Sequence, residues 1–313
     1  MRWIETMREG DRISDIYLCK NKVNAKTKIG KSYYSLLLQD KTGTVDGKVW
    51  DLSSGIDHFE AMQYIHIDGD VTTFQGSLQL NIRRIRLARE GEYNPVDYLP
   101  TSPYDRREMY QKIVKLVDSI QDESLHALAV SFFVEDKTFI QEFVAHSAAK
   151  SVHHSFLGGL LQHTLRVTEL CDFYCRQYPA LNRDLLITGA LCHDIGKLRE
   201  LASFPQNDYT DDGQLLGHII IGYQMVMERI ATIPGFPPRK ASELGHLILS
   251  HHGELEYGSP KKPALIEAVA LHHADNTDAK LETMSELLSG ALNDTDWLGY
   301  QRLLETNIRK TSQ

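Results

Sequence analysis

The sequence lacks the features that mark membrane, secreted and disulfide-bonded proteins. It has no run approaching the roughly 18 uninterrupted apolar residues of a membrane-spanning helix, and residues 1–9 contain no apolar signal-peptide core. The four cysteines show neither disulfide spacing nor the two pairs of a zinc site. Cys171 and Cys175, one helical turn apart in an apolar pattern, are expected to be buried free thiols. We therefore expect a cytoplasmic protein with no membrane contact.

Internal repeats and low-complexity tracts are also missing from the 313 residues, which are enough for two domains. Hydrophobic residues make up 42% and charged residues 24%, as is usual for a soluble globular protein. The formal net charge of −8 is divided unevenly, because residues 1–90 carry 14 Lys/Arg and 12 Asp/Glu and the remainder carries 20 and 30. The small basic excess favours binding of an anionic polymer by the N-terminal part.

The first ninety residues alternate between apolar and polar side chains, as strands do. Glycine-containing turns separate two pairs of β-prone runs, which predicts two hairpins. A short helix is expected over residues 55–62, before the fourth strand. The five predicted strands, which would form a small closed barrel, cover residues 12–20, 32–39, 44–50, 64–71 and 78–85.

This order of elements, together with the phrase Leu-Gln-Asp-Lys-Thr-Gly-Thr-Val-Asp-Gly-Lys-Val-Trp at 38–50, resembles an OB-fold of the nucleic-acid-binding kind. Such barrels bind single strands through a basic groove and aromatic stacking. Alternation along the second strand predicts that Tyr33 lies on the outer face and Tyr34 in the core. Trp50 and Phe74 are expected in the core as well.

Candidate contacts with a single strand are Tyr33 and the lysines around a predicted loop tip, Lys26, Lys28 and Lys31. These lysines could equally form a solubilising loop. Residues 91–104 combine glycine and prolines with little periodicity, so we expect a linker there between a barrel domain of residues 1–90 and a second domain of residues 105–313.

Strand patterns are absent beyond the linker, where apolar residues recur at three- and four-residue spacings. The second domain is therefore expected to be all-α. Its predicted helices cover residues 104–120, 123–134, 137–145, 159–178, 183–192, 214–230, 239–250, 263–275 and 279–288.

The heptapeptide Leu-Cys-His-Asp-Ile-Gly-Lys at 191–197 closes one of these apolar helices. His193 and Asp194 can each offer a metal-ligating atom, and Lys197 can point a cation at a bound anion. Gly196 is expected to let the backbone turn away at the helix end. An adjacent His-Asp pair is more often structural than functional, so its meaning depends on other ligands elsewhere in the chain.

Further potential ligands lie in or at the ends of predicted helices: His163, His218, His251, His252 and Asp275. Imidazole and carboxylate together suit divalent manganese, iron, nickel or zinc. Singly, each of these residues could be structural, as a core histidine or a helix cap. If all seven converge, they suffice for two ions, with Asp194 bridging through both oxygens. Two such ions activate water and stabilise the oxygens of a phosphoryl displacement.

The order of these residues, a histidine, then His193-Asp194, then a distal aspartate, resembles the HD superfamily of metal-dependent phosphohydrolases. His218 and the Ser-His-His-Gly run at 250–253 resemble members with two metals, while the Gly-Tyr-Pro signature of cyclic-dinucleotide phosphodiesterases is lacking. An OB-fold followed by such a domain, with His-His-Ser-Phe-Leu-Gly-Gly-Leu-Leu-Gln-His-Thr at 153–164, is similar to the YhaM-type 3′-to-5′ exoribonucleases.

This resemblance implies a hydrolase that releases nucleoside monophosphates from the 3′ end of single-stranded RNA, with single-stranded DNA as a further candidate. It implies two divalent ions held by the seven ligands, manganese first and iron, cobalt or nickel as alternatives. Asp194 and Lys197 would be catalytic, Lys197 by stabilising charge on the phosphorane. His154 and Arg166 would lie near the substrate.

Two other functions remain open from the sequence alone. The helical domain could hydrolyse a small nucleotide, such as a dNTP or a cyclic dinucleotide, or the chain could be a non-catalytic nucleic-acid-binding adaptor. The acidic helical surface could be solvated or could pair in a homo-oligomer.

Overall fold

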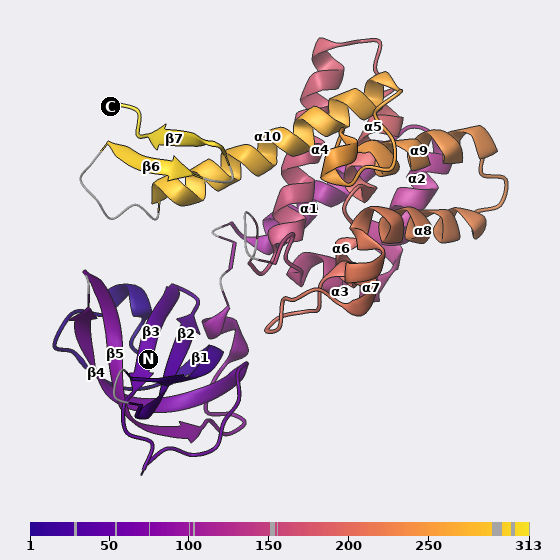
Figure 1. Cartoon of the computed structure of the whole chain (residues 1–313). Helices are drawn as coiled ribbons and strands as arrows, with labels where there is room; N and C mark the ends of the chain where they lie inside the picture. The colour runs from indigo at the N-terminus through magenta and orange to yellow at the C-terminus, as the bar shows by residue number, and fades with distance from the viewer. Residues whose placement is uncertain are drawn as a thin grey trace. The chain divides into compact units, whose positions relative to one another are not determined.

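The computed structural model describes residues 1–27, 30–53, 55–74, 76–99, 101–102, 104–150, 154, 156–289, 296–301 and 304–312. The chain forms two compact units, one of residues 1–101 with 204–206 and one of residues 102–203 with 207–313. The first is a β-barrel and the second is mainly helical (Figure 1). None of the helices in the described ranges combines the length and the apolar character needed to cross a bilayer.

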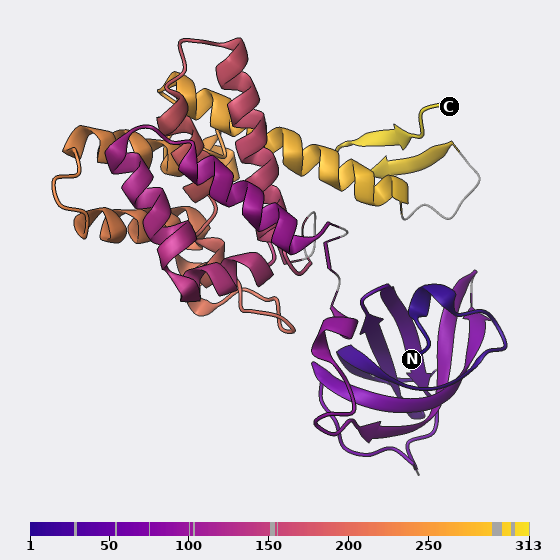
Figure 2. The same ribbon diagram turned by 180° about the vertical axis from the view of Figure 1, so that it is seen from behind.

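Five strands close the barrel of the first unit: β1 (Arg12–Lys26), β2 (Ser32–Asp40), β3 (Gly43–Val49), β4 (Gln63–Phe74) and β5 (Ser77–Leu87). They follow the order β1-β2-β3-β5-β4, and antiparallel pairing of β1 with both β2 and β4 closes the ring. Figure 2 shows the barrel from behind. The β3–β5 pair is parallel. Short 3₁₀ turns, η1 (Ile4–Thr6) and η2 (Pro95–Tyr98), flank the strands. This confirms the predicted five-stranded barrel.

Alternate apolar side chains fill the barrel, for example Ile65 and Ile67 on β4. On β2, Tyr34 is partly buried and packs against this core, edge-on to Phe59 with ring centroids 6.1 Å apart. Tyr33 lies outside the barrel core and stacks on Trp50, with centroids 4.6 Å apart. The predicted outward position of Tyr33 is thus confirmed.

Two expectations for the barrel are wrong. Described residues 55–62 form no helix, because Ile56 instead makes an isolated bridge with Ile85 of β5. Trp50 and Phe74 are 42% and 60% exposed, so neither is a core residue. Trp50 follows the buried Val49 at the end of β3, and alternation along the strand therefore turns it outward.

The second unit contains the helices α1 (Arg106–Asp118), α2 (Glu123–Val130), α3 (Lys137–Ala145), α4 (Gly159–Gln177), α5 (Arg183–Cys192), α6 (Lys197–Glu200), α7 (Asp211–Leu215), α8 (Gly217–Ala231), α9 (Pro238–Ser250) and α10 (Ile266–Ser289). A π-helical turn, η3 (Ser131–Glu135), follows α2, and a 3₁₀ turn, η4 (Leu255–Tyr257), follows α9. Side-chain oxygens of Asp105, Asp122, Asp136 and Asn182 cap the N-termini of α1, α2, α3 and α5. These caps satisfy backbone N–H groups that the first turn leaves unpaired.

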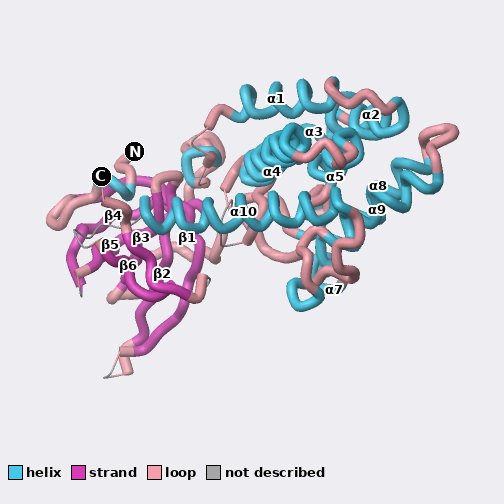
Figure 3. Tube along the Cα trace, turned by 90° about the horizontal axis from the view of Figure 1, so that it is seen from above, coloured by secondary structure: helices cyan, strands magenta, loops and turns pink. Residues whose placement is uncertain are grey.

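Helix α5 lies at the centre of this unit and is buried from Leu185 to Cys192. It packs against α2, α4, α9 and α10, and α10 runs alongside α4 (Figure 3). Because α5 is covered on several sides, the residues that follow its C-terminal end are held in the interior. The free thiol of Cys171 is buried as predicted, while Cys175 is only half-buried.

Three helical details differ from the predictions. Helix α10 is continuous where two helices were expected, since Asp275-Asn-Thr-Asp-Ala279 contains no glycine or proline to break it. The helix expected over 214–230 begins at Gly217, after the separate turn α7. The chain also forms a short hairpin of β6 (Trp297–Gln301) and β7 (Thr306–Arg309), so the mainly helical unit is not helical throughout.

Candidate metal centre

The end of α5 presents His193 and Asp194 to the interior of the helical unit. His193 is fully buried and Asp194 is 2% exposed. The Nδ1 atom of His193 donates to the carbonyl oxygen of Ala190 at 2.7 Å. This bond fixes the tautomer, so Nε2 carries the free lone pair and can serve as a metal ligand.

Gly196 lies where the backbone of α8 comes closest to this segment. Its φ of −62° is right-handed helical, so the predicted role in turning the chain away is wrong. A Cβ atom at this position would lie 2.0 Å from the carbonyl oxygen of His218 and 2.6 Å from the amide nitrogen of Gly222. Glycine therefore permits a backbone contact that brings His218 to Asp194.

Gly189 likewise permits a close approach, in this case between helices α5 and α9. A Cβ atom there would lie 2.5 Å from Cδ2 of Leu247. The close packing of the two helices brings the end of α9, where His251 and His252 follow Ser250, beside the end of α5.

A first set of ligand atoms faces Oδ2 of Asp194. The Nε2 atoms of His163 and His193 lie 3.3 Å and 3.5 Å from this oxygen. Oδ1 of Asp275 lies 3.2 Å from Nε2 of His163 and 4.0 Å from Nε2 of His193. His163, His193 and Asp275 thus each offer one atom to a common space that could hold a metal ion.

A second set faces the other carboxylate oxygen, Oδ1 of Asp194. Nε2 of His218 lies 3.4 Å from it and Nε2 of His251 lies 3.7 Å from it. His252 joins these two histidines in a group whose ligand atoms all lie within 4.8 Å of one another. Nδ1 of His251 donates to the Ile248 carbonyl at 2.7 Å, which leaves its Nε2 for a ligand.

The chemistry of the second set fits a divalent ion. Oδ1 of Asp194 and Nε2 of His218 and of His251 are buried with no hydrogen-bond partner among the described residues, an arrangement that is unfavourable unless something else satisfies them. Burial raises the pKa of the Asp194 carboxyl, but Lys197 and the imidazoles outweigh it and hold the pKa well below its usual range. Burial also lowers the pKa of His251 well below its usual value. Ionised carboxylates and neutral imidazoles are the forms that bind metals. In the first set, burial lowers the pKa of His163, but hydrogen bonds to Asp194, Asp275 and Asp278 outweigh it and raise that pKa well above its usual value, so a metal ion would have to displace a proton there.

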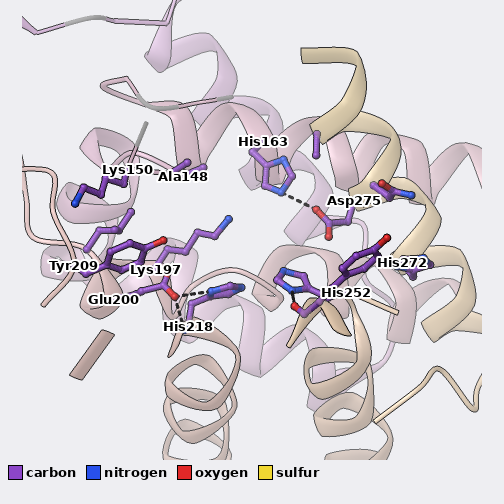
Figure 4. Close-up of a pocket in the computed structure, with 15 residues that line it drawn as sticks. Ala148, Lys150, His163, Lys197, Glu200, Tyr209, His218, His252, His272 and Asp275 are labelled. Atoms are coloured by element: carbon purple, nitrogen blue, oxygen red, sulfur yellow. Dashed lines mark hydrogen bonds and ion pairs between the residues drawn. The ribbon is translucent and has the colours of Figure 1, made fainter. Parts of the chain in front are cut away.

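Lys197 also lies at the cluster. Its Nζ is 2.7 Å from Oδ2 of Asp194, and its side chain is 14% exposed. Both ligand sets open on one cavity of about 490 Å³, which Figure 4 shows in close-up. The residues that line it are Ala148, Ala149, Lys150, His163, Lys197, Glu200, Leu201, Tyr209, His218, His252, Tyr257, His272, Asp275, Asn276 and Ala279.

Two carboxylates that the sequence does not single out contact the Nδ1 atoms of two of the histidine ligands. Oδ2 of Asp278 lies 2.7 Å from Nδ1 of His163. Oε1 of Glu200 accepts from both Nδ1 and the backbone N–H of His218, each at 2.9 Å. Each acid follows a recognised site residue by three positions on a helix, Asp278 after Asp275 and Glu200 after Lys197, and this spacing is the signal that could have found them.

His154 and Arg166, expected beside the substrate, lie in the layer behind His163. His154 is fully buried, and its Nε2 is 2.8 Å from Oδ2 of Asp278. Arg166 pairs with Glu282 and has Nη1 3.6 Å from Oδ1 of Asp278. Neither side chain lines the cavity. Both are held by carboxylates of α10, His154 by Asp278 and Arg166 mainly by Glu282.

The remaining predicted contacts belong to the barrel. Lys26 ends β1 and Lys31 precedes β2, and both side chains are exposed. Tyr33 stacks on Trp50, as described above. Lys28 lies outside the described residues.

Comparisons with known proteins find a family model for part of the helical unit and relatives that span most of the chain. Residues 160–280 match the HD domain family. The 3′-5′ exoribonuclease YhaM of Geobacillus sp. (strain WCH70) is 37% identical over 283 residues, which cover 89% of this chain and 86% of the relative. The 3′-5′ exoribonuclease YhaM of Bacillus velezensis is 34% identical over 283 residues, 89% of this chain and 88% of the relative. Among solved structures, the second OB-fold domain of replication protein A from Methanococcus maripaludis is 18% identical, with a TM-score of 0.22 over 29% of this chain and 96% of that one.

Proposed function

Because the chain belongs to the YhaM family of 3′-5′ exoribonucleases, we propose that it is a metal-dependent hydrolase that releases nucleoside monophosphates from the 3′ end of single-stranded RNA, at the cavity beside Asp194. One observation carries the choice of site: the two oxygens of the Asp194 carboxylate face two separate sets of ligands. A single carboxylate so placed can be shared by two ions.

In this proposal, His163, His193 and Asp275 hold one ion and His218, His251 and His252 hold the other, with Asp194 between them. Manganese is the first candidate, with iron, cobalt and nickel as alternatives, since imidazole and carboxylate ligands suit all of them. When bound, such ions polarise a phosphoryl oxygen and make a water molecule more acidic.

The chain's own residues supply positioning and charge. Lys197, in the cavity wall beside Asp194, places an ammonium group where the negative charge of a cleaved phosphodiester develops. Its ion pair with Asp194 is nearly excluded from water, so the charge is poorly screened. Glu200 and Asp278 accept hydrogen bonds from His218 and His163 and keep each imidazole turned toward the cluster.

The barrel is proposed to bind the single strand upstream of the cleaved end. Tyr33 and Trp50 form an outward aromatic pair on which bases can stack, with the exposed Lys26 and Lys31, and Lys28 between them in sequence, as phosphate contacts. Stacking and phosphate contacts are available to DNA as well, so single-stranded DNA is proposed as an alternative substrate.

Substituting Asp194 tests the site. We expect wild-type protein with Mn²⁺ to shorten 5′-labelled single-stranded RNA from its 3′ end. Asp194→Asn removes the charge shared by both ligand sets, so the rate should fall by at least about 100-fold. RNA affinity, measured by fluorescence anisotropy, should change by less than about twofold, because the barrel supplies most of the binding in this proposal.

Asp172→Asn is the matched control. Asp172 lies on α4 of the same unit and pairs with Arg176 and Arg183, away from the cluster. This variant should degrade RNA at the wild-type rate. Rapid cleavage by a pure, metal-saturated Asp194→Asn preparation would contradict the assignment of the site.

A further inference from the structure

Two tyrosines with no part in the proposed chemistry line the cavity beside the ligand sets. Tyr209 is 43% exposed and Tyr257 is 66% exposed, although both belong to the wall of one cavity. The backbone of Tyr209 is anchored by a bridge to Leu201. Figure 4 shows Tyr209 beside Lys150.

The wall that carries Tyr209 is held in place by one amide side chain. Asn207 is only 9% exposed and accepts a hydrogen bond from the Ser147 hydroxyl. Its Nδ2 donates to the carbonyl oxygens of Ala149 and Lys150, each at 3.1 Å. The segment of Ala149 and Lys150 and the loop of Tyr209 are thus tied together, and a preorganised wall loses less entropy when a ligand binds.

Tyr257 is tied to the ligand set itself. It ends η4, and its carbonyl oxygen accepts from Nδ1 of His252 at 2.8 Å. This hydrogen bond therefore fixes the backbone of Tyr257 relative to the His252 side chain. An aromatic ring carried on this turn lies next to the place where a phosphodiester would be held.

Lys150 adds a cation to the same wall. Its Nζ lies 2.6 Å from Oδ1 of Asp208 and 5.8 Å from the ring centroid of Tyr209. Both partners of this ion pair are about half exposed, and pairs of this kind contribute little stability. Lys150 is therefore able to exchange Asp208 for a phosphate oxygen. Aromatic rings that can stack on a base, together with a cation that can bind a phosphate, suit a nucleotide as the ligand.

We propose that Tyr209 and Tyr257 form the subsite for the 3′-terminal nucleobase of the substrate, with Lys150 directed at its phosphates. This inference rests on the proposed function and deepens it. The cavity of about 490 Å³ falls in the size range of small-ligand pockets. Stacking is available to every base, so this subsite accepts all four nucleotides and rejects a 3′ end that lacks its base.

Binding of the product tests the subsite without any turnover. Full-length protein with Mn²⁺ is titrated calorimetrically with AMP and with ribose 5-phosphate, which is the same product without its base. Wild-type protein should bind AMP at least about fivefold more tightly. Tyr209→Ala and Tyr257→Ala should each weaken AMP binding and leave ribose 5-phosphate binding unchanged, whereas Tyr209→Phe keeps the ring and should retain the preference.

Tyr178→Ala is the control, because Tyr178 is a 61% exposed tyrosine of the same unit that does not line this cavity. It should bind both ligands as wild type does. Equal affinity of wild type for the two ligands would overturn the subsite. So would an unchanged preference in both alanine variants, or an equal loss for both ligands, which a merely structural role predicts. Failure of wild type to shorten labelled RNA would instead overturn the proposed function, while the AMP preference still decides the subsite.

Discussion

His163 is contacted on both of its ring nitrogens. Nε2 faces Asp194 and Asp275, and Nδ1 faces Asp278 at 2.7 Å. Asp278 also contacts His154, so one buried carboxylate holds two imidazoles. Such a carboxylate fixes the tautomer of a metal-ligating histidine and makes it a stronger ligand.

Asp278→Asn should therefore weaken metal binding while nearly preserving side-chain volume. We expect the Mn²⁺ dissociation constant to rise by about 10-fold or more, as measured by calorimetry on metal-stripped protein. Glu282→Gln removes a neighbouring charge that pairs with Arg166 and does not contact His163, so its effect should be much smaller. Wild-type Mn²⁺ affinity in Asp278→Asn would show that this carboxylate does not support the ligand.

The sequence identifies the residues that meet at Asp194 better than those behind them. His193-Asp194 and the distal aspartate form a recognisable order, and the structure brings all of the predicted ligands together. Asp278 and Glu200 carry only a three-residue spacing from Asp275 and Lys197, and this spacing alone does not distinguish them from solvated acids until their packing partners are known. The same limit applies to Arg166, whose pairing with Glu282 on α10 could not be predicted from the sequence.

At the level of helices and strands, periodicity predicts the elements but not the contacts between them. The predicted barrel strands and most helices are present, since alternation and three- and four-residue spacing report which face is buried. The role of Gly196 could not be predicted, because it depends on a backbone from α8 that lies far along the chain. The β6–β7 hairpin was missed because most of its side chains are not buried and give no clear alternation.

Gly196→Ala should separate α8 from the end of α5. The added Cβ would meet backbone atoms, which cannot rotate away, so we expect a loss of about 2 kcal/mol or more in the free energy of unfolding. Urea denaturation measures this loss, and Mn²⁺ binding should weaken with it, because His218 moves. Gly222→Ala, whose Cβ would lie 3.2 Å from the amide nitrogen of Gly196, serves as the graded comparison and should destabilise less. The reverse order of the two variants would contradict the close-contact explanation.

At the scale of the whole molecule, the chain divides into two compact units with different chemistry. In the proposed function, the small basic excess of residues 1–90 favours the barrel as the part that binds an anionic polymer. The outward position of Trp50 was not predicted, because a tryptophan at a strand end is apolar enough to be assigned to the core. In the structure, it enlarges the aromatic surface that Tyr33 offers.

If the barrel binds the strand and the helical unit cleaves it, the effect of barrel substitutions should depend on the length of the RNA substrate. Tyr33→Ala and Trp50→Ala should each weaken binding of a long single-stranded RNA by about 5-fold or more, since each removes part of a stacking surface. Hydrolysis of a dinucleotide should stay near the wild-type rate, because so short a substrate needs only the cavity of the helical unit. The comparison of kcat/KM on the two substrates measures the effect. Phe74→Ala, an exposed aromatic at the end of β4, is the control and should change neither. Equal losses on long and short RNA would mean that the aromatic pair supports the fold and does not bind the strand.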